Sequence, residues 1–390
     1  MQRSQRIRGL TGGGSDGWDV FLKARRMIAD GVDVTELTIG EHDIRTAAPI
    51  LQEMHSAAMR GHTGYAAVPG TVSLRDTVAA RVQARTGVPT TRDNVVITPG
   101  GQAGLFAAHM AACDPGDRAL YIDPYYATYP GTLRGAGAVP QAIRTRAEDA
   151  FQPRAEAIRA SSRDAASLLI NTPNNPTGVV YADATLEAIA EICREDDLWL
   201  ISDEVYDTQV WEGRHLSPRA LPGMAERTLV VGSMSKSHAM TGSRCGWIVG
   251  PEETIADLIT LATHTTYGVP GYIQDASVFA LQQGADFEAQ IAAPFRRRRA
   301  LAQDLLARQK TVGLIPAQGA MYLMLDVRAT GMTGEAFAYD LLESHHIAVM
   351  PGESFGASAA GHIRVAMTVE DVAFARALET LCIHAERRAA

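Results

Sequence analysis

The sequence predicts an α/β fold accompanied by a smaller α+β domain, and three observations support this prediction. From about residue 70 to residue 250, short apolar runs alternate with segments of helical periodicity, as a sheet covered by helices requires. Several runs are apolar throughout, which is typical of parallel strands buried on both faces. Beyond about residue 280, the pattern becomes a long helix, a short strand, a second helix and a final strand. The 390 residues suffice for two or three domains.

The N-terminal 45 residues contain one helical stretch, Trp18 to Asp30, but too little apolar surface to fold alone. We therefore expect this segment to pack on the smaller domain. The next helix is predicted from Ser73 to Gly87, because Ser73 can serve as an N-cap and Gly87 and Pro89 are stop signals.

Four later apolar runs are predicted to be strands of the sheet: Leu168 to Ile170, Leu198 to Ser202, Thr228 to Gly232 and Gly246 to Gly250. Between the first two, the segment Asp183 to Arg194 has its apolar residues on one helical face. It predicts a helix that connects these strands. If the strands are parallel, the connection is a right-handed crossover.

The C-terminal region predicts a strand from Met321 to Asp326, a helix from Glu335 to His345 and a strand from His362 to Ala366. We assign residues 46–280 to the large domain, and residues 1–45 together with 281–390 to the small domain. The run Arg296 to Arg299 lies in a stretch of helical spacing. A solvated helix face is expected there in preference to a nucleic-acid patch.

Composition limits the classes of function. A formal net charge of -8 and a pI near 5.8 disfavour nucleic acid as a partner, since such binding relies on cationic side chains. The four cysteines lie far apart without a CxxC pair, which predicts a reduced, cytoplasmic setting. No apolar run approaches the roughly 20 residues that cross a bilayer. No membrane span or metal site is expected.

Polar residues follow two of the predicted strands. The turn Asn171 to Gly178 contains two X-Pro steps and a glycine, which fix an irregular loop at the carboxyl edge of the sheet, where α/β proteins bind ligands. Asp203 ends the next strand, where a carboxylate is costly unless a cation pairs with it. Alone, the turn also fits a rigid loop, and Asp203 also fits a helix N-cap.

Two further segments suit anion binding and amine chemistry. The glycine-rich turn Thr98 to Gly104 leads into a helical pattern, and glycines at a helix start let backbone N–H groups close on an anion. The turn lacks the Lys-Ser/Thr of a P-loop and GxGxxG spacing, so nucleoside triphosphate and NAD binding are disfavoured. Lys236 ends a Ser-Met-Ser-Lys run after a strand, before the polar cluster Thr241 to Arg244. Alone, this lysine also fits a surface position.

In order and spacing, these segments resemble the fold-type I, class I/II aminotransferases related to aspartate aminotransferase, along nearly all of the chain. The resemblance extends to Leu37–Glu41, Gly64–Tyr65, Pro124–Tyr126 and His362–Val365. It implies a mainly parallel sheet of seven strands with helices on both faces, and pyridoxal 5'-phosphate as cofactor. It also implies a ping-pong reaction that moves the amino group of an L-amino acid to a 2-oxo acid.

The resemblance also assigns roles to individual residues. Lys236 matches the lysine that holds the cofactor as a Schiff base and later acts as general base. Asp203 matches the carboxylate that keeps the pyridine nitrogen protonated. Tyr206 and Asn175 match the groups that hydrogen-bond the phenolic oxygen, and Tyr126 matches the aromatic residue that stacks on the ring.

The same resemblance assigns the phosphate to three backbone groups and three side chains: Gly101, Gln102, Ala103, Ser233, Ser235 and Arg244. Tyr65 matches a residue that reaches the phosphate from a neighbouring subunit, which implies a homodimer with shared active sites. Arg364 matches the arginine that binds the substrate α-carboxylate, with Gly40 on its other side and Asn175 nearby. Without the motif, an arginine on a short strand is also consistent with a surface charge.

The substrate is less well defined than the type of reaction, because some relatives that act on aspartate carry a lysine where this chain has Gln102. We expect the turn Gly12 to Trp18 and the segment His264 to Gly268 to line the substrate pocket, together with Tyr126 and His238. Trp18 and Tyr267 hint at room for an apolar or aromatic side chain.

Two alternative functions are considered. A β-lyase or synthase on the same fold would use the same residues and differ in its product. A cofactor-sensing transcription regulator is disfavoured, because the roughly 35 residues before Gly40 leave no room for a DNA-binding module and the chain is acidic.

Overall fold

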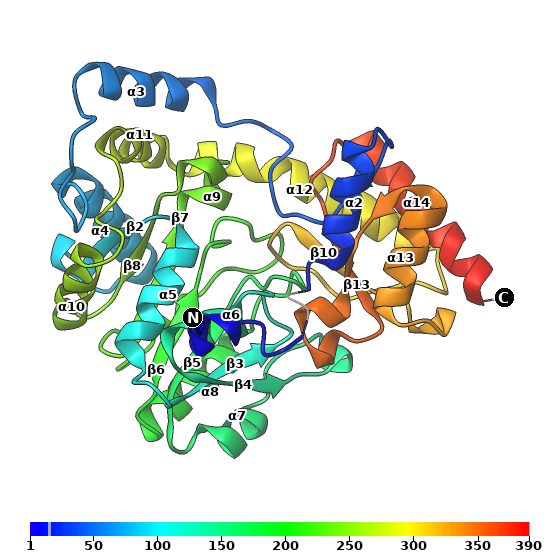
Figure 1. The fold of residues 1–390 in the computed structure, drawn as a ribbon, viewed down its shortest axis with the longest axis horizontal. Coiled ribbons are helices and arrows are strands. Elements are labelled where there is room, and N and C mark those ends of the chain that lie inside the picture. Colours follow the sequence, from blue (N-terminus) through cyan, green and yellow to red (C-terminus); the bar gives the residue numbers. More distant parts are fainter. Residues whose placement is uncertain (15–16, 390) are drawn as a thin grey trace.

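The computed structural model describes residues 1–14 and 17–389, which form a large α/β domain and a smaller domain beside it (Figure 1). The large domain contains a seven-stranded sheet of order β2-β8-β7-β6-β5-β3-β4. Strand β8 is antiparallel to both of its neighbours, and the other pairs are parallel, which confirms the predicted sheet. The strands are β2 (Val95–Thr98), β3 (Arg118–Asp123), β4 (Val139–Arg144), β5 (Ala165–Asn171), β6 (Trp199–Asp203), β7 (Thr228–Ser233) and β8 (Gly246–Val249).

Helices cover both faces of this sheet. Because side chains alternate along a strand, Leu168 and Ile170 pack with α7 and α8, whereas Leu169 packs on the opposite face with α5, α6 and α10. Helices α4 and α11 pack on the β2–β8 end. The helices of this domain are α3 (Ala48–Met59), α4 (Val72–Thr86), α5 (Gly101–Ala112), α6 (Tyr129–Ala136), α7 (Ala155–Ser162), α8 (Asp183–Glu195), α9 (Met234–Ser237), α10 (Glu252–Thr263) and α11 (Gly271–Gln282).

Helix α4 has the predicted end but a different start. Its N-cap is Thr71, whose hydroxyl accepts a hydrogen bond from Leu74 N, so the assignment of Ser73 as N-cap was wrong. Gly87 ends the helix in the left-handed conformation, at φ 71°, as its stop signal predicts. Helix α8 connects β5 to β6, and these strands are parallel as expected.

The smaller domain is built on a four-stranded antiparallel sheet, β12-β13-β10-β9, and a two-stranded parallel pair, β1-β11. Helix α1 (Gln5–Arg8) contacts α6, whereas α2 (Asp19–Ala29) packs on α13. The remaining elements are β1 (Thr35–Glu36), α12 (Gly284–Leu306), β9 (Gly313–Leu314), β10 (Tyr322–Asp326), α13 (Gly334–His345), β11 (Ile347–Ala348), β12 (Met350–Pro351), β13 (His362–Ala366) and α14 (Asp371–Ala389).

The run of four arginines in α12 differs from its predicted role as a solvated helix face. Arg298 is buried and forms ion pairs with Asp43 and Asp371. Arg299 is also buried and forms an ion pair with Glu212. Helix α12 runs from the large domain into the small one (Figure 1), so two of its arginines meet carboxylates from distant segments. Within residues 1–14 and 17–389, no helix combines the length and apolar character that a bilayer span needs.

Candidate active site

A cavity of about 300 Å³ lies where the carboxyl ends of β5, β6 and β7 face β10 and β13 of the smaller domain. It is lined by twelve of the residues that the sequence singled out: Gly40, Gly101, Gln102, Tyr126, Asn175, Asp203, Tyr206, Ser233, Ser235, Lys236, Arg244 and Arg364. Ala103 and Tyr65 do not line it in this chain. The fold thus gathers candidate residues from eight separate segments, at the carboxyl edge of the large sheet and on the facing smaller domain.

Lys236 enters the cavity from α9, directly after β7. The hydroxyl of Ser233 caps this short helix by accepting a hydrogen bond from Ser235 N at 3.1 Å. The Lys236 amine donates a hydrogen bond to the carbonyl of Gly40. Burial lowers the pKa of Lys236 to about 8, partly offset by the negative charge of Glu41. A larger fraction of this amine is therefore neutral near physiological pH, as a nucleophile requires.

Asp203 ends β6 with its carboxylate in the cavity. One oxygen accepts a hydrogen bond from Tyr129 Oη at 2.7 Å, and the other accepts one from Val205 N at 3.3 Å. Burial raises the pKa of Asp203 to about 6, and the bond from Tyr129 opposes that rise. The backbone carbonyl of Asp203 accepts a bond from Asn171 Nδ2 at 2.9 Å. Asp203 is a strand-end carboxylate and does not cap a helix.

Arg364 is a buried cation, with 1% of its surface exposed. Its guanidinium donates to the Thr38 carbonyl and, at 2.8 Å, to Asn175 Oδ1. The rings of Tyr322 and Phe355 each lie 4.4 Å from its guanidinium carbon. Burial lowers the pKa of Arg364. Its burial excludes the interpretation as a surface charge. Within the described chain, no carboxylate forms an ion pair with this arginine, so its charge is available to an anion in the cavity.

The opposite end of the cavity suits a phosphate. Helix α5 begins there, and its first backbone N–H groups have no partner within the helix. Gly100 precedes it at φ 81°, and a Cβ on this residue would overlap the guanidinium of Arg244. Arg244 donates to the Thr241 carbonyl at 2.7 Å and has no ion pair among the described residues. The hydroxyls of Ser233 and Ser235 lie 2.9 Å apart beside it.

Buried phenols form the remaining polar wall. Tyr206 Oη is 3.0 Å from Tyr322 Oη, and burial raises the pKa of both hydroxyls. Burial also raises the pKa of Tyr126 to about 12. Tyr126 packs edge-on against Trp18 and Tyr129, with ring centroids 6.5 and 5.8 Å away. These hydroxyls therefore stay protonated and can donate hydrogen bonds.

Several pocket predictions need correction. Trp18 and Tyr126 line the cavity as expected. Of the rest of the predicted turn, Gly12–Gly14 and Gly17 do not line it, and residues 15 and 16 lie outside the described part of the chain. His238 does not line the cavity either. It is fully buried and stacks on Phe287, because residues two apart on a helix point to different sides. Residues 264–268 do not line the cavity of the same chain. The side chain of Gln102 does, with Nε2 2.8 Å from Thr132 Oγ1 and Oε1 accepting from Thr128.

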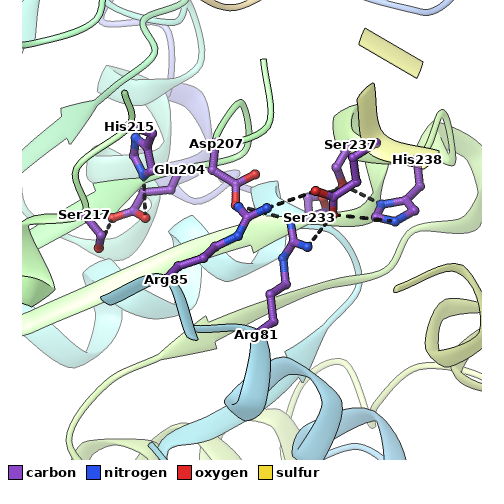
Figure 2. A network of polar contacts seen from close by, with 10 residues as sticks. Arg81, Arg85, Glu204, Asp207, His215, Ser217, Ser233, Ser237 and His238 are labelled. Carbon is purple, nitrogen blue, oxygen red and sulfur yellow. Dashed lines mark hydrogen bonds and ion pairs between the residues drawn. The ribbon is translucent and has the colours of Figure 1, made fainter. Parts of the chain in front are cut away.

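A charged network surrounds the segment that follows β6 (Figure 2). Arg81 and Arg85 of α4 form ion pairs with Asp207 and with Glu288 of α12. Nearby, Glu204 accepts hydrogen bonds from Ser202 and Ser217 at 2.9 and 2.7 Å and lies 2.9 Å from His215 Nε2. The network holds the residues on either side of Tyr206.

The family model for class I and II aminotransferases matches residues 32–381. The chain therefore belongs to this family of pyridoxal-phosphate-dependent transaminases, and the fold and predicted cofactor agree with that membership. The residues present fit the cofactor, since the cavity combines a buried amine, a buried carboxylate and an anion-binding helix start with an unpaired arginine.

Individual relatives are similar along most of the chain. The arginine–pyruvate transaminase AruH of Pseudomonas aeruginosa is 38% identical, with 95% of this chain and 94% of the relative covered. The aspartate/prephenate aminotransferase of Thermus thermophilus is 34% identical, with 92% and 93% covered. A structure of Thermus thermophilus aspartate aminotransferase with maleate has a TM-score of 0.92 and 32% identity, covering 98% of this chain and all of that one. The β-lyase or synthase alternative is not favoured.

Proposed function

We propose that this chain moves the amino group of an L-amino acid to a 2-oxo acid by a ping-pong reaction, with Lys236 as the residue that holds the cofactor. One observation carries the proposal. The cavity contains three cationic side chains, Lys236, Arg244 and Arg364, and none forms an ion pair within the described chain. Such a site is suited to a ligand with two anionic groups and a reactive carbonyl.

Lys236 is favoured as the anchor because the sequence contains three lysines and the other two lie elsewhere. Lys23 forms an ion pair with Glu343 on the smaller domain, and Lys310 is exposed after α12. When bound, pyridoxal phosphate supplies an aldehyde that forms a Schiff base with an amine and a ring that accepts electrons. In our proposal, the α5 start, Ser233, Ser235 and Arg244 bind its phosphate.

The remaining side chains of the cavity would orient the cofactor and substrate and would hold or move protons. Asp203 would hold a proton on the pyridine nitrogen, and its bond from Tyr129 keeps the carboxylate oriented. Arg364 would bind the substrate α-carboxylate in a bidentate arrangement beside Gly40. Asn175 and Tyr206 would hydrogen-bond the phenolic oxygen. The Lys236 amine would then carry the proton to and from the α-carbon.

We also propose a homodimer in which Tyr65 completes the partner's phosphate site. Tyr65 is 93% exposed and packs edge-on against Tyr267, with ring centroids 5.3 Å apart. Two adjoining exposed aromatic rings favour a protein partner over solvent. Light scattering of the purified protein tests the dimer, and mixing a Lys236 variant with a Tyr65 variant tests whether sites are shared, since a mixed dimer would regain one intact site.

Two further proposals concern organisation and location. The division into residues 46–280 and residues 1–45 with 281–390 is supported by the core of the smaller domain, which includes Val20, Leu37 and Phe374. The early helix α1 instead contacts α6, so the N-terminal segment reaches both parts. A reducing, cytoplasmic location is supported by the four cysteines, which are buried and free.

For the substrates, we propose L-arginine and pyruvate as the first pair to test. Gln102 is neutral, and both ends of its amide are already engaged by Thr132 and Thr128, which disfavours a distal carboxylate at this position. The similarity to an arginine–pyruvate transaminase supports the same pair. Aspartate with a 2-oxo acid is the alternative, as the Thermus relatives suggest.

The test is the visible spectrum of purified protein with pyridoxal phosphate, recorded before and after single amino acids from a broad panel. Each amino acid gives one half-reaction, so the panel identifies the donor. We expect a cofactor band that a restricted set of amino acids converts to the amine form, and no such band in Lys236→Ala. A band that persists while oxo acid and ammonia accumulate would indicate a lyase instead.

A further inference from the structure

Tyr322 of β10 contacts three of the proposed site residues at once. Its hydroxyl is 3.0 Å from Tyr206 Oη, and its ring centroid is 4.4 Å from the guanidinium carbon of Arg364. The hydroxyl also lies against Gly40, where an added Cβ would overlap it. Tyr322 lines the cavity while being almost entirely buried. It therefore joins the small domain to a residue of the large one.

Arg364 contacts the ring of Tyr322 at a position where a buried arginine usually has a carboxylate partner. The guanidinium donates to two neutral oxygens, on Thr38 and Asn175, and contacts two aromatic rings, on Tyr322 and Phe355. Aromatic faces attract a cation without neutralising it. A carboxylate partner would compete with the substrate, whereas two rings fix the guanidinium and leave its charge available.

The hydroxyl of Tyr322 acts on a different group. A tyrosine has one proton to donate, so when Tyr206 donates to a ligand it can only accept from Tyr322. Burial raises the pKa of both phenols, so both remain protonated. Hydrogen bonds in a chain polarise one another, and a donor behind Tyr206 makes Tyr206 a stronger donor.

We propose that Tyr322 is a positioning residue with two separable functions: its hydroxyl strengthens Tyr206 as a hydrogen-bond donor to the cofactor's phenolic oxygen, and its ring holds Arg364 for the substrate carboxylate. The inference rests on the proposed function of this cavity. It predicts that the two functions can be removed independently, because one depends on the oxygen atom and the other on the aromatic face.

The first test titrates the visible absorption band of the holoenzyme with pH. In the form of the holoenzyme that predominates at high pH, the cofactor's phenolic oxygen carries more uncompensated negative charge than in the low-pH form. A weaker hydrogen-bond donor to this oxygen therefore destabilises the high-pH form and shifts the equilibrium toward the low-pH form. Tyr322→Phe should raise the midpoint by roughly 0.2–0.5 pH units, as expected for a cooperative strengthening of 10–30%. Tyr121→Phe, the matched control, removes a buried phenolic hydroxyl that does not line the cavity and should leave the midpoint unchanged.

The second test measures the dissociation constant of 2-methylalanine, which has an α-carboxylate and an amine but no α-hydrogen, from its effect on the same band. Tyr322→Leu and Phe355→Leu should each weaken binding by roughly 5- to 30-fold, the range for a desolvated cation over a ring. Tyr322→Phe keeps the ring and should stay within twofold of the wild type.

The pattern across the three variants decides the matter. Tyr322→Phe with an unchanged midpoint overturns the hydroxyl function, and Tyr322→Leu with unchanged affinity overturns the ring function. A purely structural role would lower the thermal stability of all three variants while moving neither readout selectively, which also overturns the proposal. If the wild type itself forms no cofactor band that amino acids convert, the proposed function fails and the inference fails with it.

Discussion

Replacement of Arg364 by lysine tests the proposed carboxylate site while keeping the positive charge. The guanidinium is oriented by its bonds to Thr38 and Asn175, and these leave its unpaired charge facing the cavity. A lysine can offer one hydrogen bond to a carboxylate where arginine offers a planar pair. Each charge-assisted bond contributes about 1.5–3 kcal/mol.

The loss of one such bond, with displacement of the other, should cost about 2–4 kcal/mol of transition-state binding, or roughly 30- to 1000-fold in kcat/KM. The assay is the steady-state rate with the amino donor that the spectral panel identifies. Arg219→Lys is the matched control, because Arg219 is a buried arginine bound to the Ala225 carbonyl and does not line the cavity. Arg364→Lys with kcat/KM within threefold of the wild type, or an equal loss in the control, would refute the carboxylate role.

Three further predictions follow from individual contacts. Tyr129→Phe removes the 2.7 Å bond to Asp203 and should weaken cofactor affinity roughly tenfold by equilibrium titration, whereas Tyr121→Phe should not; equal affinities would contradict this role. Asp207→Asn breaks the half-buried pairs with Arg81 and Arg85 and should lower the free energy of unfolding of the apoprotein by about 2 kcal/mol in urea, between the values for surface and buried pairs, with exposed Asp183→Asn as control; a loss below about 0.5 kcal/mol would contradict it. Reductive methylation of apoprotein Lys236 should rise with pH through a midpoint of about 8, since burial lowers its pKa and the neutral amine reacts; a midpoint above 10 would count against it.

The large sheet was predictable because its signals are local. The runs at β5 to β8 are mainly apolar, and each is bounded by polar or glycine residues, so their burial follows from composition. The end of α4 was predictable for the same reason, since Gly87 is compatible with a left-handed helix cap. The start of that helix was missed, because Thr71 and Ser73 are chemically similar caps two residues apart.

The supporting residues of the site could not be predicted, because their roles arise from contacts between distant segments. Tyr129 is 74 residues from Asp203, and Tyr322 is 116 residues from Tyr206. Arg298 meets Asp43 from 255 residues away, so its periodicity indicated a helix but not a buried face. In contrast, the candidate residues that line the cavity were found through motifs of fixed order. For the supporting residues Tyr129 and Tyr322, the sequence signal is a tyrosine at the start of a helix or of a mainly apolar strand.

The most direct test of the central claim is to locate the covalent attachment of the cofactor. The holoenzyme is reduced with borohydride, digested and sequenced by mass spectrometry. The chain offers three lysines, so the assignment is unambiguous. We predict a single modified peptide that carries the reduced cofactor on Lys236. Modification of Lys23 or Lys310 instead, or no modification of Lys236 in protein that retains its visible band, would contradict the account.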